Sequence, residues 1–258
     1  MSGTSIDVKD LSFSYGDHLV LDGVSFSASN GELLCVLGPN GVGKSTLFNC
    51  ILGLAKPQYG AVLLDGKPVA EYPARELALK IAYVPQSHAP TFNYSVFDMV
   101  LMGTTARVGG LSAPGAEQMQ IAEEALERVG ISHLRTRGYL QISGGERQLT
   151  LIARALAQNA DVVIMDEPTA NLDYGNQLRV LARVRDLTRE GLTVIQSTHN
   201  PDHAFLFAAR VLALVGGKVA ADGKPDEVVT EQLIHDLYGV TVRLTRSESG
   251  AIRCEPLL

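Results

Sequence analysis

The stretch Gly38-Pro39-Asn40-Gly41-Val42-Gly43-Lys44-Ser45-Thr46 carries the strongest signal in this sequence, because it fits the phosphate-loop pattern G-x-x-x-x-G-K-[ST]. Glycine lets the backbone come close to a triphosphate and adopt positive φ without a Cβ clash. Lys44 offers a flexible positive charge to the β- and γ-phosphates, and Ser45 offers a hydroxyl to Mg²⁺. Apolar runs predict a strand over 32–37 and a helix over 46–54, whose N-terminus would face the anion. This strand–loop–helix context favours a phosphate site over a glycine-rich turn that binds nothing.

Composition limits the classes of protein to which this chain can belong. Of its 258 residues, 46% are hydrophobic and 19% are charged, which suits a globular protein with a sizeable core. The net charge is −6 and Lys and Arg form no dense run, so a nucleic-acid partner is not expected. The three cysteines lack metal-ligand spacing, and a reduced, cytosolic compartment is the simplest expectation. The start of the chain has no signal-peptide pattern, and the longest apolar stretch, 204–215, contains Arg210 and is too short to span a bilayer.

Alternating apolar residues predict a small antiparallel sheet whose strands flank the loop on both sides in sequence. Strands are expected over 6–15, with a break near its middle, and over 24–28. Residues 61–69 are typical of a hairpin with Asp65-Gly66 at its turn. Tyr15 ends the first strand, and it is either an ordinary strand aromatic or a ring that stacks on adenine.

A pair of carboxylates follows another predicted strand, at 161–165, which is apolar enough to be buried. Asp166 and Glu167 come directly after this strand, where two adjacent carboxylates are costly unless they meet a metal or polar partners. Asp166 suits the shell of Mg²⁺, and Glu167 suits a general base that orients the attacking water.

Two further strands, predicted over 81–84 and 193–198, are followed by Gln86 and His199. Either residue is by default a solvated loop residue. The carboxyl ends of parallel strands lie at one edge of a sheet, however, so both residues could share that edge with the carboxylates. Gln86 is placed there to reach a metal ion.

Residues 87–159 have helical periodicity, and we interpret them as an inserted helical subdomain. One helix, over 116–129, would turn Met119 towards the core. The next helix starts at Ser143-Gly144-Gly145-Glu146, where Ser143 and Glu146 form a capping box. The glycine pair is not needed for capping and would expose a second helix N-terminus to an anion, which suggests a nucleotide held by another copy of the chain.

The last third of the chain continues the pattern of helices and strands. A helix is expected over 177–190, a hairpin over 211–220, a helix over 226–237 and a strand over 240–244. The end of the chain carries no chemistry that its residues reveal.

Together these motifs resemble the ATP-binding cassette (ABC) transporter ATPases, in the family's order and over nearly the whole chain. Residues 38–45 look like Walker A, 162–166 like Walker B and 142–148 like the ABC signature. Tyr15, Gln86 and His199 match the aromatic loop, the Q-loop and the switch histidine, and 171–173 match the D-loop. The signature departs slightly from the family pattern, with Ile142 where Leu is usual and Glu146 where many members have Gln.

The resemblance implies an α/β fold: a P-loop NTPase (RecA-like) core with an antiparallel β subdomain (1–86 and 160–222), a helical subdomain (87–159) and a C-terminal extension (223–258). It also implies a head-to-tail dimer that holds ATP and Mg²⁺ between Walker A of one copy and the signature of the other. Glu167 would be the base, His199 would contact the γ-phosphate and Asp173 would link the two sites. The implied nucleotide contacts are Tyr15, Gly38, Pro39, Asn40, Gly41, Val42, Gly43, Lys44, Ser45, Thr46, Gln86, Asp166, Ser143, Gly144, Gly145, Glu146 and Asp173, and the metal contacts are Ser45, Gln86 and Asp166.

The single cassette looks most similar to the importer group for iron-siderophores, haem and cobalamin, some of whose close relatives carry molybdate or tungstate. The resemblance implies two integral-membrane permease subunits, a periplasmic or surface solute-binding protein, and a location on the cytoplasmic face of the inner membrane. Two alternatives come from other classes: a soluble ABC ATPase in DNA repair or translation, and another P-loop enzyme such as a small-molecule kinase or a GTPase. The sequence has no sustained heptads, second Walker A, basic patch or guanine motif that would favour them.

Overall fold

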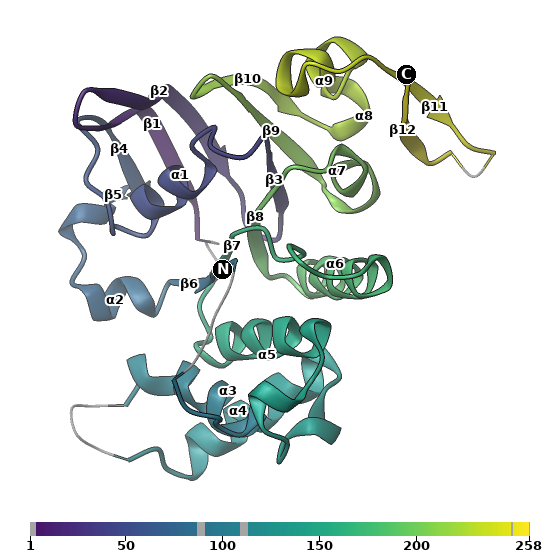
Figure 1. Ribbon diagram of the computed structural model, residues 1–258. Coiled ribbons are helices and arrows are strands. Elements are labelled where there is room, and N and C mark those ends of the chain that lie inside the picture. The colour runs from purple at the N-terminus through teal and green to yellow at the C-terminus, as the bar shows by residue number, and fades with distance from the viewer. Residues whose placement is uncertain (1–3, 87–90, 109–112, 249, 258) are drawn as a thin grey trace. The chain divides into compact units, whose positions relative to one another are not determined.

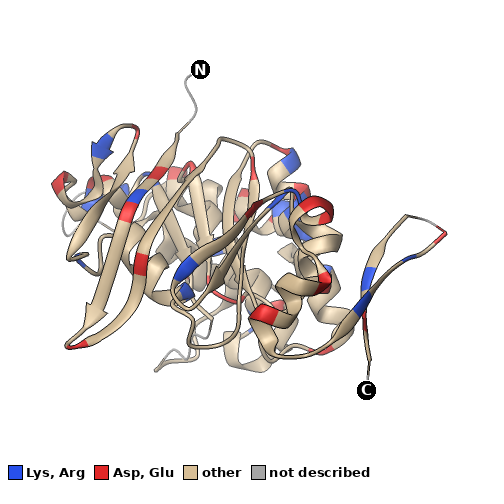
Figure 2. Ribbon diagram, turned by 90° about the horizontal axis from the view of Figure 1, so that it is seen from above, with Lys and Arg blue, Asp and Glu red and all other residues tan. Residues whose placement is uncertain are grey.

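The computed structural model describes residues 4–86, 91–108, 113–248 and 250–257 (Figure 1). Its contacts divide the chain into a first unit of Met1–Tyr72 with Leu187–Leu258 and a second unit of Pro73–Asp186. The predicted helical block 87–159 includes 87–90 and 109–112, which lie outside the described residues. Lys and Arg residues are interspersed with Asp and Glu residues on the ribbon (Figure 2).

The first unit contains the antiparallel sheet that alternation predicts. Its strand order is β2 (His18–Ala28), β1 (Ile6–Tyr15), β4 (Tyr59–Leu64) and β5 (Lys67–Pro68). The break predicted within β1 is a shift of register between Val8 and Leu11, where Asp10 adopts a φ of 46°. Asp65 and Gly66 have φ of 53° and 78°, as a type I′ hairpin turn between β4 and β5 requires.

The first unit also holds the strand that precedes the phosphate loop. The order is β10 (Lys218–Gly223), β9 (Arg210–Val215), β3 (Leu33–Leu37) and β8 (Thr193–Thr198). β3 runs parallel to both β8 and β9, and every one of its residues is buried, which explains its unbroken apolar sequence. The predicted helix after the loop is α1 (Lys44–Ile51), and β8 is followed by α7 (Pro201–Phe207).

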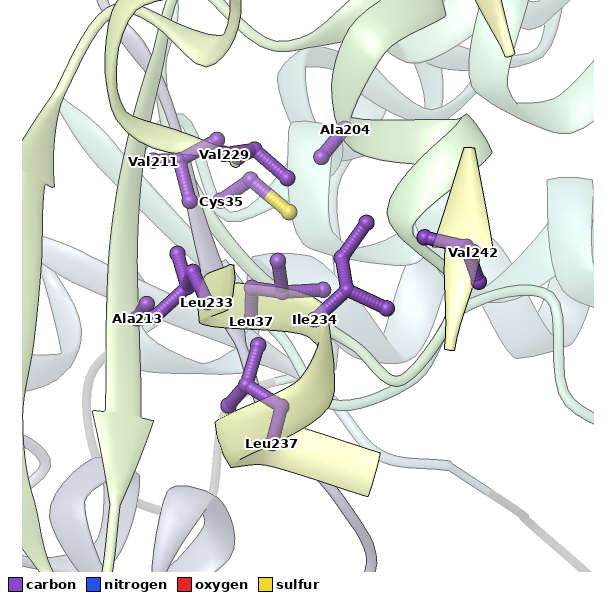
Figure 3. Packing of buried hydrophobic residues seen from close by; sticks show 10 residues of the cluster. All are labelled: Cys35, Leu37, Ala204, Val211, Ala213, Val229, Leu233, Ile234, Leu237 and Val242. Carbon is purple, nitrogen blue, oxygen red and sulfur yellow. The ribbon is translucent and has the colours of Figure 1, made fainter. Parts of the chain in front are cut away.

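The end of the chain differs from its prediction. One helix was expected over 226–237, but the structure has α8 (Pro225–Val228) and α9 (Glu231–Tyr238), because Thr230 caps a new helix by accepting a hydrogen bond from the Leu233 N–H at 3.1 Å. The chain then forms a hairpin of β11 (Val242–Arg246) and β12 (Ile252–Pro256), whose second strand the sequence did not predict. Apolar side chains from β3, α7, β9, α9 and β11 form one buried cluster (Figure 3).

The second unit places a parallel pair of strands beside a group of helices. β6 (Ile81–Val84) pairs with β7 (Val162–Met165), and α2 (Ala74–Ala78) and α6 (Tyr174–Arg189) lie next to them in sequence. The helices α3 (Val96–Leu101), α4 (Ala116–Val129) and α5 (Gly144–Ala157) pack on one another. The described residues also form 3₁₀ turns: η1 (Val69–Glu71) in the first unit, and η2 (Met102–Ala106), η3 (Ser132–Leu134) and η4 (Tyr139–Gln141) in the second.

One side-chain prediction can be compared with helix α4. Met119 was expected to face the core but is 47% exposed, because the buried stripe of α4 begins one turn later, at Ala122. Helix α6 buries Leu181, Val184 and Leu187. None of the described helices has the length and mean hydropathy needed to cross a bilayer.

Candidate functional site

The phosphate loop joins β3 to α1 and needs its glycines for two separate reasons. Gly41 and Gly43 adopt φ of 82° and 111°, which favour glycine. Gly38 is instead constrained by space, because a Cβ there would lie 2.9 Å from Val42 Cγ1 and 3.0 Å from the Leu214 carbonyl oxygen. The loop therefore keeps its backbone close to its surroundings at its base, while Asn40 and Gly41 are exposed at its tip.

Lys44 is the first residue of α1 and is buried by the loop that precedes it. Its Nζ donates hydrogen bonds to the carbonyl oxygens of Gly38 at 2.8 Å and Pro39 at 3.0 Å. Ser45 is exposed on the first turn of α1, and Thr46 next to it is buried. The first turn of this helix contains no acidic residue, so the partial positive charge of the helix N-terminus is not offset there by an acidic side chain of that turn.

His199 lies close to the start of this loop. β3 and β8 run side by side with Leu37 opposite Thr198, and the Gly38 N–H donates to the Thr198 carbonyl oxygen at 3.2 Å. The next residue along the chain is His199, whose side chain is exposed. The first unit thus brings the switch-histidine position and the phosphate loop together.

Tyr15 belongs to the same unit, at the end of the antiparallel sheet. It is 57% exposed, and its ring meets that of Phe13 edge to face with centroids 4.8 Å apart. Tyr15 pairs with His18 on β2. Val20 and Leu21, two and three residues further along this strand, lie against Gly43. This end of the sheet is therefore anchored on the phosphate loop.

In the second unit, Gln86, Asp166 and Glu167 gather at the ends of β6 and β7. Val84 is opposite Met165, and the Asp166 N–H donates to the Val84 carbonyl oxygen at 2.9 Å. Gln86 Nε2 donates to Glu167 Oε2 at 3.5 Å. Both carboxylates are buried, at 5% and 8% exposure, in accord with the expectation that they need polar partners.

Glu167 adopts a backbone conformation that is unusual for its residue type. Its φ is 43°, in the left-handed region where non-glycine residues rarely lie. Such strain is concentrated at functional sites, where the surrounding structure holds the residue in place. The turn after β7 thereby fixes the direction in which Glu167 leaves the strand.

The start of α5 has a structural explanation for each of its residues. The Ser143 Oγ accepts from the Glu146 N–H at 3.3 Å, and Glu146 Oε2 accepts from the Ser143 N–H at 2.7 Å, which completes the predicted capping box. Hydrogen bonds from the Ser143 backbone and side chain lower the pKa of the Glu146 carboxyl. Gly144 is exposed, but Gly145 is buried, and a Cβ on it would come within 2.6 Å of Asn176 Oδ1 on α6. The second glycine of the signature is thus required by close packing, a reason that the sequence did not reveal.

Asp173 holds the start of α6. Its Oδ1 accepts from the Asn176 N–H at 2.8 Å and its Oδ2 accepts from Asn176 Nδ2 at 2.7 Å, and these bonds lower its pKa. Asn176 therefore connects Asp173 of the D-loop position to Gly145 of the signature. Sequence reasoning missed Asn176, because only the close approach of α5 and α6 identifies it.

The predicted site residues thus form two sets, one in each unit. The first set contains Tyr15, the loop 38–46 and His199, and the second contains Gln86, Asp166, Glu167, the signature start and Asp173. Of the three expected metal ligands, Ser45 belongs to the first unit, and Gln86 and Asp166 belong to the second.

A family model for the ABC transporter matches residues 21–170, which include the loop, the signature position and the carboxylate pair. The chain belongs to the ABC transporter family. As a member, it is an ATP-binding, ATP-hydrolysing subunit with the α/β P-loop fold that the resemblance implied.

Individual ABC proteins are similar to this chain over most of their length. An uncharacterized ABC transporter ATP-binding protein of Haemophilus influenzae is 41% identical over 209 residues, which cover 81% of this chain and 80% of that protein. The hemin import ATP-binding protein HmuV of Gloeobacter violaceus is 38% identical, with 88% of this chain and 84% of that protein covered. A solved metal-chelate type ABC transporter in an inward-facing conformation superposes with a TM-score of 0.86 at 30% identity, over 99% of this chain and 98% of that chain.

Proposed function

We propose that this chain is the motor subunit of an importer that takes up an iron-siderophore or a similar metal chelate. It would act at the cytoplasmic face of the inner membrane, bound to two permease subunits that receive solute from a binding protein. The similarity to a metal-chelate type transporter and to a hemin import protein supports this class of solute. Haem, cobalamin and molybdate or tungstate are the alternative solutes, since the solute does not touch the motor subunit.

The hydrogen bond between Gln86 and Glu167 is the observation that carries the proposed chemistry. It holds a buried carboxylate in a fixed direction at the edge of the sheet, next to Asp166. In the proposed reaction Glu167 accepts a proton from the water that attacks the γ-phosphate, and His199 donates a hydrogen bond to that phosphate. Lys44 balances the charge of the β- and γ-phosphates.

Mg²⁺ fits the residues proposed to hold it. The Ser45 hydroxyl, the Asp166 carboxylate and the Gln86 side chain offer oxygen ligands, which Mg²⁺ prefers. Because Gln86 Nε2 is directed at Glu167, its carbonyl oxygen Oε1 is the atom suited to a cation. When bound, Mg²⁺ would neutralise charge on the phosphates and keep water among its ligands.

ATP is proposed to close two copies of the chain head to tail, because its phosphates would contact the loop of one copy and the start of α5 of the other. Hydrolysis removes that differential binding and lets the dimer open, which is a population shift that ATP controls. Asn176 contacts both Gly145 and Asp173, and this supports the proposal that the signature and the D-loop move together.

An exposed apolar patch of the second unit is the proposed contact with the permease. Phe92 and Tyr94 are 65% and 36% exposed with ring centroids 6.0 Å apart, and Leu140 is 46% exposed. The Tyr139 N–H donates to the Tyr94 carbonyl oxygen at 2.8 Å, so the two segments lie side by side. The patch lies a few residues after Gln86 in the chain, and this supports a role in transmitting the nucleotide state.

The Glu167→Gln variant tests the role of the base. With ATP and Mg²⁺ it is expected to bind nucleotide, to lose turnover and to elute as an ATP-bound dimer in size-exclusion chromatography with light scattering. Glu76→Gln, which changes an exposed carboxylate on α2, should behave like the unmodified chain. Unchanged turnover in Glu167→Gln would show that another group is the base.

The same variant tests the partner. Glu167→Gln, captured with ATP and Mg²⁺ from detergent-solubilised membranes, should bring down a multi-span permease that mass spectrometry identifies, and through it the class of solute. A second capture with Phe92→Ser added should lose that permease. Recovery of soluble partners alone, with the chain absent from the membrane fraction, would instead support a soluble ABC ATPase.

A further inference from the structure

The C-terminal hairpin is held on both sides by a carboxylate at one rung of its ladder. Leu244 of β11 and Cys254 of β12 lie opposite each other. The Leu244 N–H donates to Glu231 Oε1 of α9 at 2.8 Å, and the Cys254 N–H donates to Asp202 Oδ1 of α7 at 2.9 Å. β12 packs against α7 along this edge. The hairpin therefore joins α9 to α7.

Asp202 also belongs to the turn that presents His199. The Asn200 N–H donates to Thr198 Oγ1 at 3.1 Å, and Asn200 Oδ1 accepts from the Asp202 N–H at 2.9 Å. Thr198 is in turn bonded to Gly38 through its carbonyl oxygen. His199 thus lies on a turn fixed at one end by the phosphate loop and at the other by Asp202 and β12.

Apolar packing stabilises the same arrangement. Ala204 of α7 and Val242 of β11 belong to one buried cluster with Leu37, the last residue of β3 before the loop (Figure 3). Helix α7 has only seven residues, so its direction depends on these contacts and on Asp202. The thiol of Cys254 makes a further contact with Asp202. Burial, the charge of Asp202 and a hydrogen bond to Asp202 together raise the pKa of this thiol to about 12, so it stays protonated at neutral pH.

We infer that Asp202, held by strand β12, is a positioning residue for His199, and that the C-terminal hairpin is part of the hydrolysis machinery. The inference rests on the proposed function, because it assumes that His199 contacts the γ-phosphate. Asp202 does not touch nucleotide in this assignment. It sets the direction of α7 and so the place of His199 at the edge of the loop.

A double-mutant cycle on the full chain tests this, with ATP turnover, ATP affinity and thermal unfolding measured for each variant. Asp202→Ala should lower kcat about tenfold, because a small misplacement of a contact group is enough for that, and should leave ATP affinity unchanged. In a His199→Ala background the same change should have no further effect, because the group that Asp202 positions is gone. Asp202→Asn, whose Oδ1 can still accept from the Cys254 N–H, should restore most of the turnover.

Two further variants approach the contact from the hairpin. Cys254→Pro removes the N–H that donates to Asp202 and places the proline ring against this carboxylate, but it removes no bond to β11, because this N–H points out of the ladder. Cys254→Pro should lower kcat as Asp202→Ala does, and it gives an independent test if Asp202→Ala folds poorly. Cys254→Ser keeps the N–H and should keep kcat. Glu231→Ala is the matched control, because it removes the bond to the Leu244 N–H on the other strand of the same rung. Glu231 is far from His199 in sequence, so this variant should keep kcat.

The outcomes separate the inference from the proposed function. Full turnover in His199→Ala alone would refute the role of His199 and with it the basis of the inference. A loss in His199→Ala together with equal losses from Asp202→Ala in both backgrounds would show that Asp202 acts independently of His199, and would overturn the positioning role. Normal kcat in both Asp202→Ala and Cys254→Pro would also overturn the positioning role.

Discussion

The backbone N–H of Gly38 donates a hydrogen bond to the carbonyl oxygen of Thr198 at 3.2 Å. This bond joins the first residue of the phosphate loop to the residue that precedes His199. The bond extends the pairing of the parallel strands β3 and β8 to the start of the loop and so ties the loop to the residue before the histidine. The predictions below follow from this and the other contacts of the two units.

Lys44→Ala is expected to weaken ATP binding at least about tenfold, because it removes a buried cation from a loop that would carry the phosphates. Titration with a fluorescent ATP analogue measures the change. Lys56→Ala, which removes an exposed lysine of the same unit, should leave the affinity unaltered. Equal affinities for the two variants would contradict a phosphate-binding role for Lys44.

Tyr15→Ala is expected to lower ATP affinity about tenfold, the usual scale for loss of one base–aromatic stack. Tyr15→Phe keeps the ring and should bind normally. Tyr59→Ala is the control, because Tyr59 is also an exposed strand tyrosine of this sheet, at 74% exposure. If Tyr15→Ala and Tyr59→Ala bind ATP alike, Tyr15 is an ordinary strand aromatic.

Gly145→Ala is expected to lower the free energy of unfolding by about 1–3 kcal/mol, since the new Cβ would press on Asn176, which is itself held by Asp173. Gly144→Ala should be nearly neutral or stabilising, because its Cβ would lie 3.2 Å from the flexible Leu172 side chain and alanine favours a helix. Urea unfolding of both variants measures the difference. Similar free energies of unfolding for the two variants would mean that Asn176 moves aside without cost and that close packing does not require Gly145.

His203 should make stability depend on pH. Burial lowers the pKa of this histidine, with a smaller opposing effect of Asp202. Below about pH 6.5 the unfolded chain therefore binds a proton at His203 that the folded chain excludes. The contribution of His203 to the free energy of unfolding is complete above this pH and is lost as the pH falls towards the folded-state pKa. Urea unfolding at pH 7.5, 6.5 and 5.5 should show a shallower decline for His203→Gln, and parallel declines would refute the assignment.

Much of this fold could be predicted because its signals are local. The apolar run of β3, the Asp65-Gly66 turn and the capping box at Ser143 each depend on residues a few positions apart. Even the break in β1 was visible in the alternation and corresponds to the positive φ of Asp10. The ends of the strands were predicted well enough to place Gln86 beside the carboxylate pair.

The features that the sequence did not reveal depend on contacts between distant residues. Gly103 is an example: a Cβ there would clash with the Arg154 carbonyl oxygen of α5, which explains a glycine that its own neighbours do not. Asn176 and β12 are of the same kind, because each acquires its meaning only from an element brought to it by folding. Met119 shows the opposite case. Its position fits the helical period, but its side chain is exposed because no other element among the described residues covers this turn of α4.

The positive φ of Glu167 has a consequence for how this protein can change. A non-glycine residue in that conformation costs about 1–3 kcal/mol, and Glu167→Gly would relieve the strain. Selection for heat resistance alone would thus tend to remove the carboxylate. In the proposed mechanism such a variant would bind ATP but could not hydrolyse it, so the proposed base is kept at a cost to the stability of the fold.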